Sequence, residues 1–174
     1  MKISAATCDK LNQLLYLSFD CNAMADNFAY NIDFMCYPNV ANIYHHSFAH
    51  LFPQLADEIS DLMIKLDARP IRKATNSYDT QYFDLISIFK DSDTMTEKYR
   101  QAIKSTIDVA DYNGDYEVRI ALEDFLEDFL PYVKQSSVWA RKAEEYKEKP
   151  AQFDVHFARL TPFIPIEESD LADD

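Results

Sequence analysis

Glycine is almost absent from this sequence, because Gly114 is the only glycine among 174 residues. Sheet proteins commonly use glycine in their tight turns, so its scarcity argues against a fold of many short strands. The sequence also has no apolar run near the roughly 18 residues that a membrane-spanning helix needs. It therefore favours long helices joined by few connections, and no insertion into a membrane is expected.

Positive charge is scarce as well, since 17 lysines and arginines face 30 acidic residues and give a net charge of −13. Phosphate backbones repel such a surface, so nucleic-acid binding by the folded body is not expected, whereas metal cations are attracted. The odd number of cysteines, Cys8, Cys21 and Cys36, without C-x-x-C spacing, is typical of free thiols in a reducing compartment. The N-terminus lacks the apolar segment of a secretory signal. We expect a cytoplasmic protein.

Hydrophobic residues make up 48% of the chain, which excludes disorder over most of its length. Their spacing follows the period of an α-helix in long stretches that end near proline, asparagine or glycine. Pro53 and Pro131 lie inside two of these stretches and are expected to bend the helices. The four predicted helices span about residues 8–35, 39–68, 94–112 and 116–147.

The lengths of the connections suggest how these helices are arranged. The first and second pairs are joined tightly, so each pair should form an antiparallel hairpin. The link between the second and third helices, residues 70–92, is long and contains a short amphipathic helix at about residues 82–89. The predicted fold is therefore an all-α, up-and-down four-helix bundle over residues 1–149, with the long crossover of ferritin-like topology. Residues 150–174 should form an acidic, proline-containing tail that is docked on the surface or loose.

Four stretches of the sequence stand in an order and spacing that suggest a known family: residues 11–15, residues 55–70, the Asn113-Gly114-Asp115 turn with Ala121-Leu122, and residues 139–143, which read Trp-Ala-Arg-Lys-Ala. In these stretches the sequence resembles the Dps-type mini-ferritins of the ferritin-like superfamily. The resemblance implies iron oxidation and storage, protection from oxidative stress by peroxide, and assembly into a hollow homo-oligomer. In that family the oligomer is a dodecamer, with dimers formed through the first two helices.

The sequence departs from the family at the iron site. Tyr30 and Asn42 stand where Dps proteins place histidines on the first and second helices. The Glu-x-x-His pairs of larger ferritins are also absent from the second and fourth helices. The resemblance does imply an acidic pair at Asp57 and Asp61, in a site shared between two subunits.

One polar stripe on the second helix can be identified without the resemblance. At about 100° per residue, its four members fall within about 60° of one another, roughly opposite the buried Leu55. The ends of the stripe are about 22 Å apart, so one helix cannot bring all four to one ion, whereas an antiparallel dimer could. The stripe consists of His46, His50, Asp57 and Asp61.

Our hypothesis is that His46 or His50 replaces the missing family histidines, with Asp57 and Asp61 as the catalytic carboxylates. Mixed imidazole and carboxylate ligands suit iron, with manganese or zinc as alternatives. A simple solvated face would give the same pattern.

Other arrangements and functions remain open. Glu97, Glu123 and Glu127 could serve a metal site inside the bundle, although their positions also fit a solvated face. Cys21 is expected to be a small core residue. The protein could instead be a structural or interaction protein without metal chemistry. It could also be a small metal-dependent hydrolase or transferase with zinc bound by His46, His50 and His156.

Overall fold

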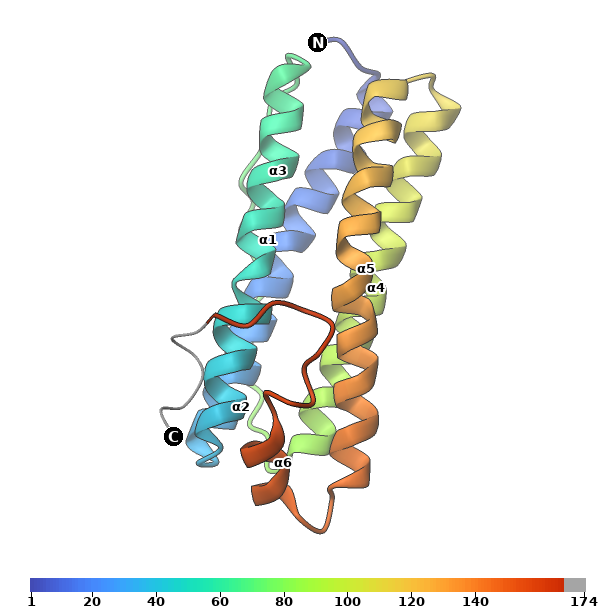
Figure 1. Cartoon of the computed structure of the whole chain (residues 1–174). Coiled ribbons are helices and arrows are strands. Elements are labelled where there is room, and N and C mark those ends of the chain that lie inside the picture. Colours follow the sequence, from blue (N-terminus) through green and yellow to red (C-terminus); the bar gives the residue numbers. More distant parts are fainter. Residues whose placement is uncertain (168–174) are drawn as a thin grey trace.

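The structure is a computed structural model that describes residues 1–167, and these residues form helices and no strand. Within them, α1 and α3 pair on one side of an elongated bundle and α4 and α5 pair on the other (Figure 1). The predicted all-α, up-and-down bundle is confirmed. Its long helices are α1 (Ala5–Phe34), α3 (Leu51–Lys65), α4 (Leu85–Tyr112) and α5 (Tyr116–Glu145).

The predicted second helix is divided into three elements. It begins as α2 (Pro38–Ile43), widens into the π-helix η1 (Tyr44–Ala49) and continues as α3. The sequence predicts a bend at Pro53, and the π-helix lies just before that proline. The Asn113–Asp115 turn is as expected, because Gly114 has a φ of 72° and ends α4 in the left-handed conformation.

The third long helix starts earlier than the sequence predicts. Residues 85–89, expected to belong to a short helix of the crossover, form the first turns of α4, so the expected boundary near Thr94 lies inside this helix. Asp84 caps it, since its Oδ1 accepts a hydrogen bond from the backbone N–H of Ser87 at 2.7 Å. Burial of Ile88 and Phe89 in the core then holds these turns against the bundle.

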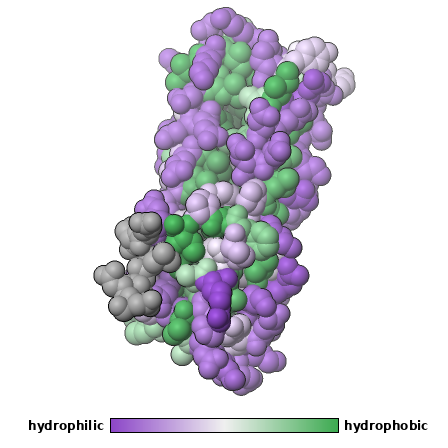
Figure 2. Space-filling model, viewed as in Figure 1, coloured by the Kyte–Doolittle hydropathy of each residue, from purple (hydrophilic) through white to green (hydrophobic). Residues whose placement is uncertain are grey.

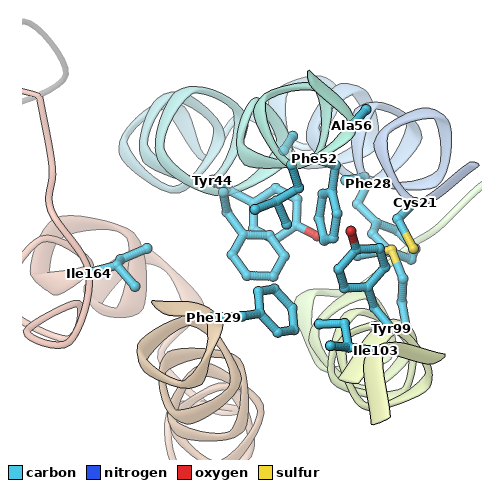
Figure 3. Close-up of a cluster of buried hydrophobic side chains, with 14 of the residues drawn as sticks. Cys21, Phe28, Tyr44, Phe52, Ala56, Tyr99, Ile103, Phe129 and Ile164 are labelled. Atoms are coloured by element: carbon cyan, nitrogen blue, oxygen red, sulfur yellow. The ribbon is translucent and has the colours of Figure 1, made fainter. Parts of the chain in front are cut away.

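Aromatic rings fill the bundle interior. Figure 3 shows Tyr44, Phe52, Tyr99 and Phe129 gathered between the helices, and all four are fully buried. Trp139 is buried among them, with ring centroids 5.7 Å from Tyr44. Rings of this size dominate the energetics of a core, so this layer accounts for much of the stability of the bundle.

The polar groups in this interior bond to one another. Tyr44 Oη and Ser92 Oγ are 2.7 Å apart, and Ser18 Oγ and Tyr99 Oη are separated by the same distance. Burying a hydroxyl without a partner costs roughly 1–3 kcal/mol, so each pair allows two polar groups to sit among the rings. These hydroxyls are therefore part of the packing.

The segment after α5 folds back over the bundle (Figure 1). The short helix α6 (Pro150–His156) buries Phe153, and the Asp154 carboxylate accepts a hydrogen bond from the Val40 backbone N–H at 3.0 Å. Further along, Thr161 Oγ1 accepts a bond from Trp139 Nε1 at 2.9 Å. Residues 150–167 of the expected tail thus lie against the bundle. The rest of its acidic end, residues 168–174, is outside the described part of the chain.

The visible face of the molecule is mostly hydrophilic, with hydrophobic patches among the charged side chains (Figure 2). None of the helices in residues 1–167 combines the length and the apolar character that crossing a bilayer requires.

Candidate metal centre

Three potential metal ligands meet where α1 passes η1. Asp26 lies on α1, His45 lies on η1, and His50 is the residue that directly follows η1. One ligand atom of each lies within 4.8 Å of the other two, and no other group of three such side chains occurs in residues 1–167. We call Asp26, His45 and His50 the surface cluster.

The contacts inside the surface cluster are close. His45 Nε2 is 3.4 Å from Asp26 Oδ1, and the rings of His45 and His50 have centroids 4.6 Å apart. Asp26 and His45 are partly buried and His50 is exposed. The cluster is therefore open to solvent on one side and walled by protein on the other.

The Asp26 Oδ1 atom is buried and only weakly satisfied. His45 Nε2, 3.4 Å away, is its polar neighbour, but the contact does not have the geometry of a good hydrogen bond. Burial raises the pKa of this carboxyl group, and the nearby His45 and His50 counteract part of that rise. A carboxylate oxygen in this position would gain from a cation placed between it and the imidazoles.

His45 is suited to bind a cation as a neutral ring. Burial lowers its pKa, and the neighbouring His50 lowers it further, while Asp26 acts in the opposite direction. A lowered pKa keeps the imidazole unprotonated at neutral pH, and the neutral ring is the form that binds metals. Two imidazoles and one carboxylate also form a donor set that fits Fe(II), Mn(II) or Zn(II).

The structure places the four predicted metal ligands as follows. His50 belongs to the surface cluster, and the exposed His46 lies beside it with ring centroids 5.5 Å apart, outside the group of three ligands. Asp57 and Asp61 are exposed on α3. Asp57 is seven residues beyond His50, or about 10 Å along the helix, so the two aspartates are not brought to the histidines within one chain.

Two members of the surface cluster, Asp26 and His45, are missing from the sequence prediction. A helical wheel with 100° per residue pairs His46 with His50 on the second helix, whereas the π-helix pairs His45 with His50. Asp26 is one turn before Tyr30 on α1, and the ring of Tyr30 contacts His45 with centroids 6.0 Å apart. A search for acidic residues one turn from the position expected for the family histidine would have found it.

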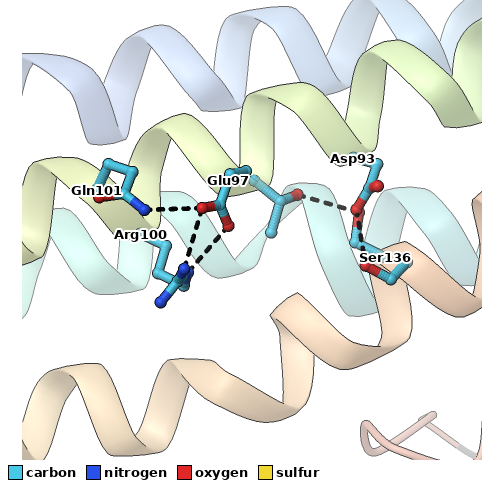
Figure 4. Close-up of polar contacts among 7 residues, drawn as sticks. Asp93, Glu97, Arg100, Gln101 and Ser136 are labelled. Atoms are coloured by element: carbon cyan, nitrogen blue, oxygen red, sulfur yellow. Dashed lines mark hydrogen bonds and ion pairs between the residues drawn. The ribbon is translucent and has the colours of Figure 1, made fainter.

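The carboxylates considered for a site inside the bundle lie outside the core. Glu97 is exposed and binds Arg100 and Gln101, as Figure 4 shows. These hydrogen bonds lower the pKa of Glu97 to about 2. Glu123, 3.7 Å from Arg119, and Glu127 are also exposed.

Cys21 and His156, the remaining candidate residues, take part in core packing and in a side-chain contact, respectively. Cys21 is buried in the core, and burial raises the pKa of its thiol, which keeps it protonated. His156 lies on α6, where its Nδ1 is 3.2 Å from Tyr146 Oη. Neither residue belongs to a group of three ligands in the described part of the chain.

A groove between α3 and α5 gathers further carboxylates. It has a volume of about 310 Å³ and is lined by Glu58, Asp61, Asp124 and Asp128. Burial, and secondarily the charge of Asp128, raises the pKa of Glu58.

Residues 8–137 match the Ferritin family, described as the ferritin-like domain. The chain belongs to the ferritin-like family. Among solved structures it is similar to a variant of PmFTN whose crystal was soaked in iron overnight. That likeness covers 87% of this chain and 98% of the other, with a TM-score of 0.82 and 11% sequence identity, so it shows the ferritin-like fold. A search of curated proteins finds no match to the sequence.

Proposed function

We propose that this ferritin-like protein is a Dps-type mini-ferritin that binds Fe(II), oxidises it with peroxide or dioxygen, and stores or detoxifies the iron. The observation that carries the proposal is the surface cluster, whose three ligand atoms lie within 4.8 Å of one another. Membership of the ferritin-like family and similarity to an iron-soaked PmFTN structure support the choice of iron.

The surface cluster acts in this proposal as the place where Fe(II) is captured. Asp26 supplies one anionic oxygen, and His45 and His50 supply neutral nitrogens. Three donors from this chain leave further coordination positions for water, an oxidant or a ligand from another subunit. The net charge of −13 raises the local concentration of Fe(II) around the protein.

Oxidation needs an acceptor for the electrons. Two Fe(II) ions give one electron each to hydrogen peroxide, and with two protons the products are two Fe(III) ions and two water molecules. Asp57 and Asp61 are proposed to stabilise the ferric product, because carboxylates are hard anionic ligands. An antiparallel dimer through α1 and the α2–α3 segment would set the aspartates of one subunit near the histidines of the other. Further assembly, up to a dodecamer, would enclose the stored iron.

The test is Fe(II) oxidation followed optically, first under air and then with peroxide. We expect rapid oxidation by the wild type and at least about a tenfold slower rate for Asp26→Asn and His50→Ala. Asp57→Asn/Asp61→Asn should also slow the reaction if the shared site forms. His156→Ala is the matched control, since this histidine lies outside the surface cluster.

Oxidation no faster than in buffer would contradict the proposal. It would instead favour the second candidate, a ferritin-like bundle with a structural or interaction role, for which the aromatic filling of the interior by Tyr44, Phe52, Tyr99 and Phe129 is the supporting observation. Sedimentation of the same samples would report the size of the assembly in either case.

A further inference from the structure

The π-helix is what brings His45 and His50 together. In an α-helix, residues five apart point about 140° away from each other. In η1 the His50 backbone N–H instead donates to the His45 carbonyl at 3.1 Å, a bond between residues five apart that widens the turn. The two rings consequently lie on the same side of the helix, with centroids 4.6 Å apart.

Pro53 disfavours an ordinary α-helix at this point. In an α-helix the Ala49 carbonyl would accept a hydrogen bond from the N–H of residue 53, but proline has no N–H. Its ring would also clash with the carbonyl four residues before it. Widening the preceding turn relieves this conflict, which accounts for a π-helix that ends at Ala49.

Asn22 supplies the hydrogen bond that Pro53 cannot. From α1, its Nδ2 donates to the Ala49 carbonyl at 3.1 Å. Asn22 is one helical turn before Asp26, so the two side chains lie on the same face of α1. On one face of α1, the Asn22 amide therefore bonds to the end of η1 and the Asp26 carboxylate contacts His45.

Pro131 shows that a proline alone does not produce this arrangement. It lies inside α5, which continues as an α-helix from Tyr116 to Glu145. Pro131 is exposed, as is Glu127, whose carbonyl is the one affected, so water can hydrate that site. At Pro53 the neighbouring helix supplies the donor instead.

We infer that Asn22 and Pro53 are the positioning residues of the metal centre, because together they hold the π-turn that sets His45 and His50 on one ion. The inference rests on the proposed metal binding by the surface cluster. Neither residue is a ligand, so both act through the histidines that they orient.

The experiment measures Co(II) binding by the full-length protein through the visible absorption of the bound ion. Pro53→Ala restores an N–H at residue 53, so η1 should relax to an α-helix and His45 should turn away from His50. We expect Co(II) affinity to fall about 10- to 100-fold and the absorption spectrum to change, as for other residues that orient metal ligands. The melting temperature should stay the same or rise, since a helix-interior proline is removed.

Asn22→Ala removes the donor to Ala49 and should weaken Co(II) binding about tenfold. The matched controls are Pro131→Ala and Asn27→Ala. Asn27 is another α1 asparagine whose amide donates to a backbone carbonyl, that of Thr80 at 3.1 Å, away from η1. Both controls should bind Co(II) with the wild-type affinity and spectrum.

Crystal structures of metal-free Pro53→Ala and Asn22→Ala provide a readout that does not depend on binding. Variants that keep the π-turn, or that bind Co(II) like the wild type, would overturn the inference while leaving the proposed function intact. A wild type that binds neither Co(II) nor Fe(II) would instead sink the proposed function. In that case the crystal structures would test only whether Asn22 and Pro53 position His45 beside His50. If the two histidines stayed together in both variants, this positioning role would also be wrong.

Discussion

The bundle interior and the surface cluster both combine aromatic rings with polar groups, but the polar groups are satisfied in different ways. In the interior, hydroxyls pair with one another, as Tyr44 does with Ser92. In the surface cluster, Asp26 Oδ1 is buried and lies 3.4 Å from His45 Nε2 without a well-formed hydrogen bond. The paired hydroxyls of the interior thus need no further partner, whereas the buried oxygen of Asp26 has capacity for a further ligand.

This difference matters because ferritin-like bundles are associated with metal sites between their helices. Here that space holds Phe52, Tyr99, Phe129 and Trp139, all fully buried. The candidate metal ligands lie instead on the flank of the bundle, where α1 meets η1. Substitutions in the two regions should therefore change different properties, stability in one and metal binding in the other.

The largest effect is expected for Trp139→Ala. Removing this buried ring leaves a cavity among Tyr44, Phe89 and Phe157 and deprives Thr161 of its hydrogen-bond donor. The free energy of unfolding should fall by about 3–5 kcal/mol, measured by urea denaturation. The folded fraction should still bind Co(II) with the wild-type affinity. A loss below about 1 kcal/mol would show that the interior is not the main source of stability.

The second-largest effect is expected for His50→Ala, which should weaken metal binding and leave stability almost unchanged. His50→Ala removes one of three ligands and should reduce Co(II) affinity by about 100-fold, the upper end of what losing a supporting residue costs. The free energy of unfolding should change by less than about 0.5 kcal/mol, because His50 is exposed. Equal Co(II) affinities of the wild type and His50→Ala in a calorimetric titration would contradict metal binding by the surface cluster.

Tyr44→Phe tests the point where the two regions meet, since Tyr44 is the first residue of η1 and its ring lies in the core. The variant loses the hydrogen bond to Ser92, so the free energy of unfolding should fall by about 1 kcal/mol. Ser92→Ala and the double variant complete a cycle that isolates the bond. Weaker Co(II) binding by Tyr44→Phe would mean that the interior and the surface cluster are coupled.

The smallest effect concerns Glu58, in the groove between α3 and α5. Its pKa is raised in the folded protein, by burial and by Asp128. The folded state therefore holds the proton more tightly than the unfolded state, and stability falls as the pH rises from about 4.3 to the raised pKa. Above that window the penalty is fully present, so Glu58→Gln should raise the melting temperature slightly at pH 7. The difference should vanish below about pH 4, and a gain that persists there would have another cause.

Much of the bundle could be predicted from local sequence. The spacing of hydrophobic residues predicts helices where α1, α4 and α5 lie and one continuous helix where α2, η1 and α3 follow one another, and Gly114 marks the turn between α4 and α5. The hydrophobic spacing predicts a start for α4 near Thr94, later than the structure shows, because it does not reveal that Asp84 caps the helix. His50 was identified as a candidate ligand from residue type and position, but its partners were not.

The sequence by itself determined which residues form helices, because helical periodicity and proline and glycine effects depend on neighbours along the chain. It also contained the cause of the π-turn, Pro53. Pro53 has no N–H to donate to the Ala49 carbonyl, and only the tertiary structure decided what replaces that hydrogen bond, since the donor is Asn22 on another helix. The tertiary structure also decided which residues form the surface cluster. Asp26 contacts His45 because α1 packs beside η1, and His45 meets His50 because the helical turn between them is wider. A helical wheel with a fixed 100° step cannot represent either condition.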